Sequence, residues 1–243
     1  MRLLLIGGAG HLGGIVRPAL EAEHTCRYLD LKPVPGAEDR TIVADVNDDE
    51  ALQRAVEDID VVVYMALGAG EPVPVGPKRA PSKHSDPDIA MRVNVLGVYR
   101  ALRHGLEAGV RRFVHASSLS VYASDGRPFP IREDMPMNAW ATYGLSKRLA
   151  EEVCRAAVDR YPDASILALR LMRPLSEPMW NERHGRRVGK HPLGPRDAQR
   201  LYLAAVRFDR PGFHVVQASG DVAGEHIPHD RAAELIGWTP RGE

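Results

Sequence analysis

Short apolar runs alternate along the chain with longer segments in which apolar residues recur at helical spacing. Nearly continuous apolar runs predict strands buried on both faces of a sheet at 3–6, 43–44, 61–65, 113–116 and 166–171. A weaker strand is predicted at 25–29 and a short one at 213–217. Helical periodicity predicts helices at 11–23, 48–56, 88–108, 142–161, 196–206 and 230–236. Strands that alternate with helices imply right-handed crossovers, and therefore an α/β fold with a doubly wound parallel sheet.

Two stretches interrupt this alternation. Residues 67–87 and 172–195 are broken by repeated prolines and glycines, and both are predicted to be irregular. A loop as long as the first is often functional, for example as a lid over a site.

The composition narrows the class of protein. Of 243 residues, 44% are apolar and 26% charged, which is typical of a globular protein. The 32 basic residues balance 32 acidic ones, and this argues against binding nucleic acid through its phosphates. No apolar stretch approaches the ~20 residues that span a bilayer, and the run after Arg2 is too short for a signal peptide. A cytoplasmic protein with buried, reduced thiols at Cys26 and Cys154 is expected.

The first predicted strand runs into a glycine-rich turn that opens the first predicted helix. Gly7, Gly10 and Gly13 follow a G-x-x-G-x-x-G spacing. Such glycines allow a tight turn, a close approach of the backbone to a pyrophosphate, and close packing of helix on strand. The helix N-terminus then offers free N–H groups and the positive end of its dipole to the phosphates. Glycine turns without ligands are common, so the surrounding residues decide the interpretation.

Asp30 strengthens the interpretation, because it ends the next strand about twenty residues on. A carboxylate there accepts both hydroxyls of an adenosine ribose and repels a 2′-phosphate. This favours NAD over NADP, although Arg27 and Lys32 lie nearby; the alternative is a solvated carboxylate. Asp45-Val46 follows the third strand, where it either lies against the adenine edge or forms a capping turn. The combination predicts dinucleotide binding.

Three further side chains indicate catalysis. Tyr143 and Lys147 share one face of a predicted helix at i, i+4 spacing. A phenol with an ordinary pKa of about 10 is a poor base at neutral pH, and a nearby ammonium favours the phenolate. Ser117-Ser118 follows the strand at 113–116, and ligands of open α/β sheets bind beyond strand C-termini. The alternatives are a surface Tyr–Lys pair and a serine that caps a turn.

These motifs, with Asn94, Glu133-Asp134 and Arg170, occur in the order typical of extended short-chain dehydrogenases/reductases. The chain resembles the NAD-dependent epimerase/dehydratase family of that class from its N-terminus to the 237–240 segment. The resemblance implies that Tyr143 is the acid/base on the substrate hydroxyl and that Ser118 orients the substrate oxygen. It implies that Lys147 binds the nicotinamide ribose and lowers the pKa of Tyr143. The cofactor contacts that it implies are Gly7, Gly10, His11, Leu12, Gly13, Asp30, Asp45, Val46, Met65, Ala66, Asn94, Tyr143 and Lys147.

The resemblance also implies an organisation for the chain. Residues 1–171 are expected to form a Rossmann-type domain that binds NAD and holds the catalytic residues. Residues 172–243 are expected to form a small substrate-binding lobe, packed so closely on the first domain that the two could count as one. Members of the family often dimerise through two helices, so a homodimer through the helices near 88–108 and 142–161 is expected.

Basic residues are concentrated where the family lines its substrate pocket. From Arg170 to Arg200 there are eight basic and three acidic residues. Arginine forks bind carboxylates and phosphates, so an anionic sugar is expected, either a sugar acid or a nucleotide sugar; a solvated basic segment is the alternative. The short lobe favours a small ligand, and the length resembles that of compact uronate dehydrogenases, whose usual Asn-His after the serine pair is Leu-Ser here. The expected substrate contacts are Ser118, Ser120, Arg170 and Arg173.

Three functions stay open at this point. The first is an NAD-dependent oxidoreductase that transfers hydride between a secondary carbinol of a sugar or sugar acid and NAD. The second is a nucleotide-sugar epimerase or dehydratase that retains NAD. The third, a non-catalytic dinucleotide sensor, is disfavoured by the Tyr143–Lys147 pair. Glu225-His226-x-x-His229-Asp230 suggests a metal, but the segment lies beside a proline in a late loop, and no metal site is expected.

Overall fold

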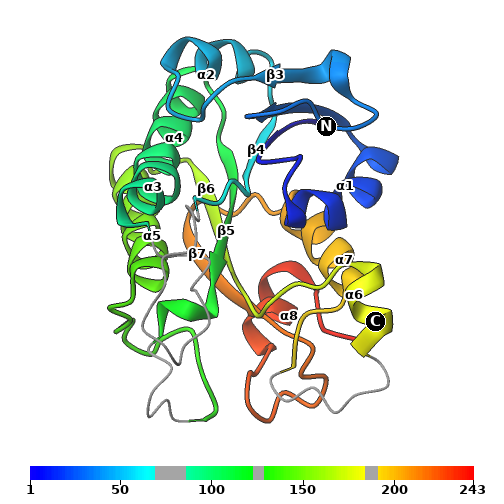
Figure 1. The fold of residues 1–243 in the computed structure, drawn as a ribbon. Coiled ribbons are helices and arrows are strands. Elements are labelled where there is room, and N and C mark those ends of the chain that lie inside the picture. Colours follow the sequence, from blue (N-terminus) through cyan, green and yellow to red (C-terminus); the bar gives the residue numbers. More distant parts are fainter. Residues whose placement is uncertain (69–85, 123–128, 184–190) are drawn as a thin grey trace.

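The computed structural model describes residues 1–68, 86–122, 129–183 and 191–243 (Figure 1). Within them, one parallel sheet has the strand order β3-β2-β1-β4-β5-β6-β7, which confirms the doubly wound α/β fold. The strands are β1 (Arg2–Ile6), β2 (Thr25–Asp30), β3 (Thr41–Val43), β4 (Val61–Tyr64), β5 (Arg112–Ser118), β6 (Ser165–Leu171) and β7 (Gly212–Ala218). The α-helices are α1 (His11–Glu23), α2 (Asp49–Ala55), α3 (Pro87–Met91), α4 (Gly97–Glu107), α5 (Thr142–Arg160), α6 (Glu177–Arg183), α7 (Pro195–Ala205) and α8 (Asp230–Ile236). Shorter helical turns are η1 (Glu38–Arg40), η2 (Arg92–Leu96) and η3 (Leu119–Val121).

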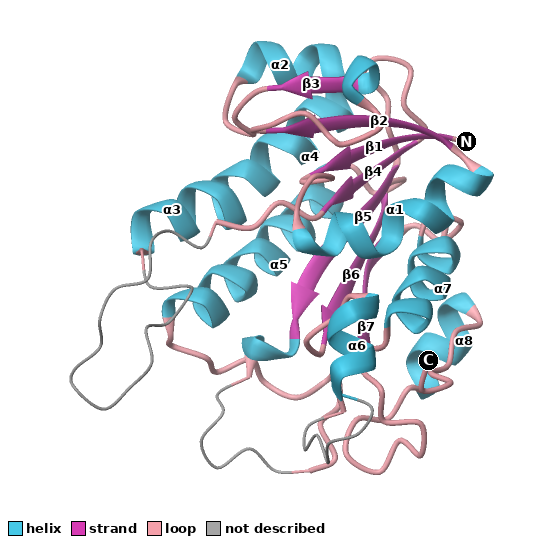
Figure 2. Cartoon of the chain, turned by 45° about the vertical axis from the view of Figure 1, so that its right-hand side comes forward, coloured by secondary structure: helices cyan, strands magenta, loops and turns pink. Residues whose placement is uncertain are grey.

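Helices cover both faces of the sheet, with α4 and α5 on one face and α1 and α7 on the other (Figure 2). A hydrophobic layer lies between the sheet and the helices on each face. Successive side chains of a strand point to opposite faces. Leu3 and Leu5 of β1 therefore pack with α1 and α7, whereas Leu4 and Ile6 pack with α2, α4 and α5. Burying one such side chain stabilises the fold by roughly 1.5–3 kcal/mol. Cys26 and Cys154 are buried free thiols in these layers, as expected.

The third strand differs from its prediction. It covers Thr41–Val43 rather than 43–44, and Val43 is 54% exposed instead of buried on both faces. The reason is its position, because β3 is the edge of the sheet and pairs with β2 alone.

The helix predicted at 88–108 is divided into α3, a π-helical turn η2, and α4. Two contacts of Tyr64 with this segment explain the division. The Tyr64 hydroxyl donates a hydrogen bond to the Val93 carbonyl, and a Cβ on Gly97 would lie 2.3 Å from the same hydroxyl oxygen. Periodicity alone does not reveal a π turn, because the apolar positions on either side keep nearly helical spacing.

Residues 172–243 complete the sheet that residues 1–171 begin. Strand β7 pairs with β6 along its length, and α7 packs beside α1 in the same core layer as Trp238. The division of the chain into a cofactor part and a substrate part stays a prediction about function. Helix α6, within the stretch expected to be irregular, was not predicted. None of the helices in the described residues is long and apolar enough to cross a membrane.

Candidate active site

A cleft of about 920 Å³ extends along the C-terminal ends of the strands, where ligands of open α/β sheets bind. The strand order reverses between β1 and β4, and ligands of such sheets bind at this point, next to the glycine turn that follows β1. Most residues predicted for the cofactor and the substrate line this cleft. They are Gly7, Gly10, His11, Leu12, Asp30, Asp45, Val46, Met65, Ala66, Ser118, Ser120, Tyr143, Lys147 and Arg173.

The glycine turn has room for a phosphate because side chains are absent. Gly7 has φ +88°, a left-handed conformation that favours glycine, and a Cβ there would lie 2.4 Å from the Ala66 backbone nitrogen. Gly10 precedes α1 and lines the cleft. Gly13 does not line it; a Cβ on Gly13 would lie 2.2 Å from the Gly8 carbonyl oxygen, so this glycine permits close packing of α1 on the turn. The turn fits the pyrophosphate of a dinucleotide.

Asp30 ends β2 with its side chain in the cleft. One carboxylate oxygen accepts a hydrogen bond from the Ala9 backbone nitrogen at 2.9 Å, which fixes the carboxylate beside the glycine turn. The two nearby cations do not neutralise it within the cleft. Arg27 donates to the backbone carbonyls of Ala55 and Glu57 at 3.0 and 2.8 Å, and neither Arg27 nor Lys32 is among the described residues that line the cleft. The arrangement fits a ribose with free hydroxyls.

Asn94 lies behind the cleft rather than in it. Its side chain is fully buried, accepts a hydrogen bond from the Gly68 backbone nitrogen at 2.9 Å, and donates one to Ser146 Oγ at 3.1 Å. Gly68 lines the cleft, whereas Ser146 belongs to α5. Asn94 therefore ties the segment after β4 to the helix that holds the catalytic candidates, which is a positioning role.

Tyr143, Lys147 and Ser118 converge in the cleft. Tyr143 is in the first turn of α5, and Lys147 Nζ lies 5.9 Å from the centre of its ring. The buried Lys147 ammonium donates a hydrogen bond to the Ala116 carbonyl at 2.7 Å. Ser118, at the end of β5, accepts a hydrogen bond from the Ser120 backbone nitrogen at 3.1 Å. All three side chains reach the space where β5 and α5 meet.

The pKa of Tyr143 is shifted in the direction opposite to the one expected. Burial raises the pKa of Tyr143, and a hydrogen bond with Ser118 only partly opposes it. Burial also lowers the pKa of Lys147 from its ordinary value to about 8, although the Glu151 carboxylate favours the charged form. The Lys147 ammonium is directed at the Ala116 carbonyl. In this state it does not produce the lowered pKa of Tyr143 that the i, i+4 spacing suggested.

Arg170 does not reach the cleft, contrary to its expected contact with substrate. Its side chain is 3% exposed, and its Nε and Nη2 donate to the two carboxylate oxygens of Glu151 at 3.0 and 2.7 Å. Glu151 also accepts a hydrogen bond from Ser117 Oγ at 2.5 Å, and Ser117 lines the cleft floor. Arg170 therefore neutralises the buried carboxylate of Glu151, which lies one helical turn after Lys147 in α5. The sequence signal was Glu151 itself, an acidic residue on the inward face of a predicted helix.

The fold, the glycine turn and the Ser/Tyr/Lys group define a dinucleotide-dependent enzyme of the short-chain dehydrogenase/reductase class. Residues 3–191 match the NAD dependent epimerase/dehydratase family. The match spans more than half of the chain, and the protein belongs to this family. Its cofactor is therefore NAD.

The sequence identity to individual relatives is low. The chain is 29% identical to the uronate dehydrogenase of Pseudomonas putida over 167 residues, which are 66% of this chain and 56% of that protein. It is 26% identical to the L-arabinose 1-dehydrogenase (NAD(P)(+)) of Haloferax volcanii over 262 residues, covering 99% of this chain and 96% of that protein. A solved structure of a mutated uronate dehydrogenase matches with a TM-score of 0.79 at 24% identity, covering 99% of this chain and 81% of that one. This likeness shows a shared fold.

Asp30 provides a test of cofactor choice. Asp30→Asn removes the charge and keeps an oxygen that can accept the hydrogen bond from Ala9. We expect the ratio of kcat/KM for NADP to that for NAD to rise by about tenfold or more, an effect of about 1.4 kcal/mol. Steady-state kinetics with each cofactor measures the ratio. Asp39→Asn, which removes an exposed carboxylate of η1 outside the cleft lining, is the matched control. Equal ratios in the two variants would exclude Asp30 as the selective residue.

Proposed function

We propose that the protein is an NAD-dependent dehydrogenase that oxidises a secondary carbinol of a small sugar acid. The observation that carries this proposal is the convergence of Tyr143, Lys147 and Ser118 in the cleft, with Arg173 at its rim. The uronate dehydrogenase among the relatives supports the choice of substrate class.

Each side chain has a defined task in this reaction. Tyr143, as phenolate, accepts the proton of the carbinol while the carbon loses hydride. Ser118 accepts a hydrogen bond from Ser120 N, so its own hydroxyl proton is directed elsewhere and can stabilise charge on the substrate oxygen. With NAD bound, Lys147 would exchange its hydrogen bond to the Ala116 carbonyl for the ribose hydroxyls next to the nicotinamide, and its charge would then favour the Tyr143 phenolate. When bound, NAD supplies the hydride acceptor and a positive charge that favours the phenolate.

Arg173 supports an anionic substrate. It is exposed at the rim of the cleft and has φ +41°, a left-handed conformation that is costly for a residue with a side chain. Such strain persists where the surroundings fix the backbone. Here the preceding residue, Met172, donates its N–H to the Ala218 carbonyl and accepts from the Leu193 nitrogen, both at 2.8 Å. From this position in the cleft lining, the guanidinium can pair with the carboxylate of a substrate.

Formation of NADH tests the proposal. Purified protein is mixed with NAD and D-glucuronate or D-galacturonate, with D-glucose and UDP-glucose as comparisons, and absorbance is followed at the NADH band. We expect one NADH per uronate oxidised and much slower reaction with neutral glucose. Arg173→Ala should raise KM for the uronate with a smaller effect on kcat, whereas Arg196→Ala, an exposed arginine outside the cleft lining, should change neither. Epimerised UDP-sugar without NADH would define an epimerase instead, and no reaction with any sugar would contradict the proposal.

The rate of oxidation is expected to depend on pH in two ways. Tyr143 must be deprotonated, and burial raises its pKa, so log kcat/KM should rise with pH through the neutral range. Lys147 has a pKa of about 8, so it loses its charge as pH rises through that value and the increase should end there. A profile of kcat/KM from pH 6 to 10 checks this. If kcat/KM did not change with pH below pH 8, Tyr143 would not be the base.

We also infer a cytoplasmic homodimer. Two buried free thiols suit a reducing compartment. Apolar side chains at Leu96, Tyr99 and Leu149, on η2, α4 and α5, are 39–49% exposed on adjacent helices, and such a patch is typical of an interface. Light scattering should give twice the chain mass of 26.7 kDa, and Leu149→Glu should give the monomer. A wild-type monomer at micromolar concentration would exclude the dimer.

A further inference from the structure

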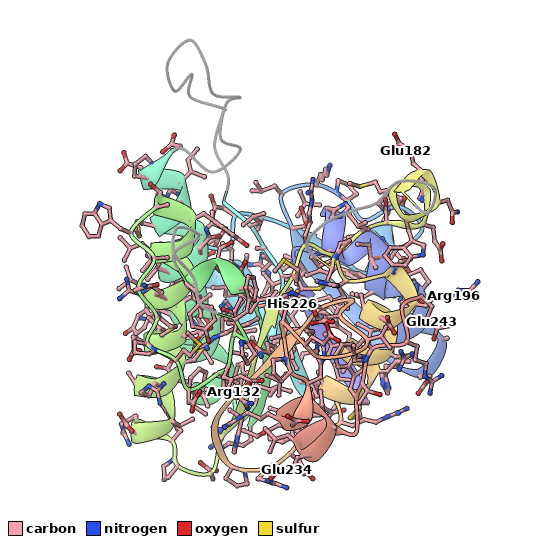
Figure 3. The ribbon with its side chains drawn as sticks, turned by 90° about the horizontal axis from the view of Figure 1, so that it is seen from below. Arg132, Glu182, Arg196, His226, Glu234 and Glu243 are labelled. Atoms are coloured by element: carbon pink, nitrogen blue, oxygen red, sulfur yellow. The ribbon has the colours of Figure 1, made fainter. Side chains whose placement is uncertain are left out.

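Three side chains converge outside the active-site cleft, beyond the C-terminal end of β7. Asp221 follows β7, His226 is in the connection to α8, and His191 precedes α7. One nitrogen or oxygen atom from each lies within 4.8 Å of the other two. The Asp221 side chain is 4% exposed, and the imidazoles of His191 and His226 are 40% and 44% exposed. Figure 3 shows His226 near the middle of the face seen from below.

The spacing of these atoms suits an ion between them better than direct bonds. His191 Nδ1 is 3.9 Å from Asp221 Oδ1, and His226 Nδ1 is 3.7 Å from Asp221 Oδ2. Both distances are too long for hydrogen bonds. Ligand atoms at 2.0–2.1 Å from a tetrahedral zinc ion lie about 3.3 Å from one another. The half-exposed imidazoles can close the remaining gap by rotating about their side-chain bonds.

The carboxylate is held in place by the backbone. Asp221 Oδ2 accepts hydrogen bonds from the backbone nitrogens of His226 and Ile227 at 2.7 and 3.0 Å. The backbone nitrogen of Asp221 donates to Ser219 Oγ at 3.1 Å, and Gly220 N donates to the His191 carbonyl at 2.9 Å. Bonds of this kind orient metal ligands before the ion arrives. They bring the backbones of all three residues together.

His226 presents a polar atom that needs a partner. Its Nδ1 is covered from solvent and has no hydrogen-bond partner among the described residues. The rings of Phe129 and His226 form a T-shaped pair with their centroids 5.0 Å apart. A buried polar atom without a partner requires an explanation, and a bound ion supplies one.

We propose that His191, Asp221 and His226 bind one divalent transition-metal ion of the zinc type, with water at the open position. Two imidazoles and one carboxylate suit zinc and its neighbours, whereas magnesium and calcium prefer oxygen ligands alone. This revises the expectation of no metal site. His229, the other histidine of the suspected motif, is buried against Trp238 and bonded to Ser219, and does not belong to the cluster.

The position of the ion suggests a structural role near the substrate. His191 is two residues from Leu193. The backbone nitrogen of Leu193 donates a hydrogen bond to the carbonyl of Met172, which lines the cleft. The ion would connect this segment to the loop after β7. It would thereby stiffen the side of the cleft that carries Arg173.

Zinc binding by the full-length, tag-free protein tests the proposal. After equilibrium dialysis against Zn²⁺ and metal analysis, we expect about one ion per wild-type chain. His191→Ala and His226→Ala should each bind at least about tenfold more weakly, because each loses one ligand of three. His214→Ala, which changes a half-buried histidine at the opposite end of β7, should bind as the wild type does. Circular dichroism confirms that each variant is folded, and His226→Gln replaces His226→Ala if the latter is not.

Cobalt gives an independent measurement that does not depend on activity. Co²⁺ bound to nitrogen and oxygen ligands should produce visible absorption bands in the wild type, and these should be absent in His191→Ala. No stoichiometric Zn²⁺ on the wild type, or equal Zn²⁺ binding by the wild type, His191→Ala and His226→Ala, would overturn the proposal. The outcome is separate from NADH formation, so the two proposals stand or fall independently.

Discussion

Tyr143→Phe is expected to lower kcat for sugar oxidation by about 10²–10⁴-fold, the usual contribution of a positioned acid/base group. The substitution removes one oxygen and keeps the ring that lies 5.9 Å from Lys147 Nζ. Affinity for NAD should therefore stay within a few fold of the wild type. Steady-state kinetics gives kcat, and a fluorescence titration with NAD gives the dissociation constant.

Tyr161→Phe is the matched control for this prediction. Tyr161 follows the opposite end of α5 and does not line the cleft, so the same chemical change there should leave kcat unaltered. If Tyr143→Phe kept wild-type activity, the assignment of the base would be wrong.

Arg170→Met is expected to destabilise the protein by about 3–5 kcal/mol. It removes the ion-pair partner of the fully buried Glu151 carboxylate, while Ser117 Oγ still donates to this carboxylate. Urea unfolding measures the change in free energy. Adding Glu151→Met to Arg170→Met removes the unpaired charge and should recover much of the loss, because a buried ion pair is often no more stable than well-packed apolar side chains.

A surface ion pair provides the comparison. Arg155 and Glu152 lie 3.5 Å apart with both side chains more than half exposed, and Arg155→Met should cost less than about 1 kcal/mol. An equally small effect of Arg170→Met would mean that the Glu151 charge is balanced in another way, for example by the nearby Lys147 ammonium.

Local signals predicted the fold and the residues that line the cleft beside the glycine turn. The glycine turn and Asp30 lie within one strand–helix–strand unit, so their spacing in the sequence largely determines their spacing in space. The spacing of Tyr143 and Lys147 was equally local, because one helix holds both. Their meeting with Ser118 followed from the rule that ligands bind at the strand C-termini.

Features that depend on partners distant in sequence could not be predicted. Arg170 was assigned to the substrate because it belongs to a basic stretch of the sequence. Its ion pair with Glu151 forms only because β6 packs beside α5 in the folded chain. The edge position of β3 depends on the strand order and not on its own residues. Similarly, local spacing suggested His226 with His229, but the folded chain places His226 beside His191 and Asp221.

A crystal structure of the complex with NAD tests the central claim most directly. We expect the adenosine ribose on Asp30 and the nicotinamide ring beside the Tyr143 hydroxyl, with Lys147 moved from the Ala116 carbonyl to the second ribose. Reacting groups poised for transfer should lie about 3–3.5 Å apart. A nicotinamide ring bound away from residues 143 and 147 would mean that Tyr143 is not the catalytic base, and the protein would then bind the dinucleotide without using it.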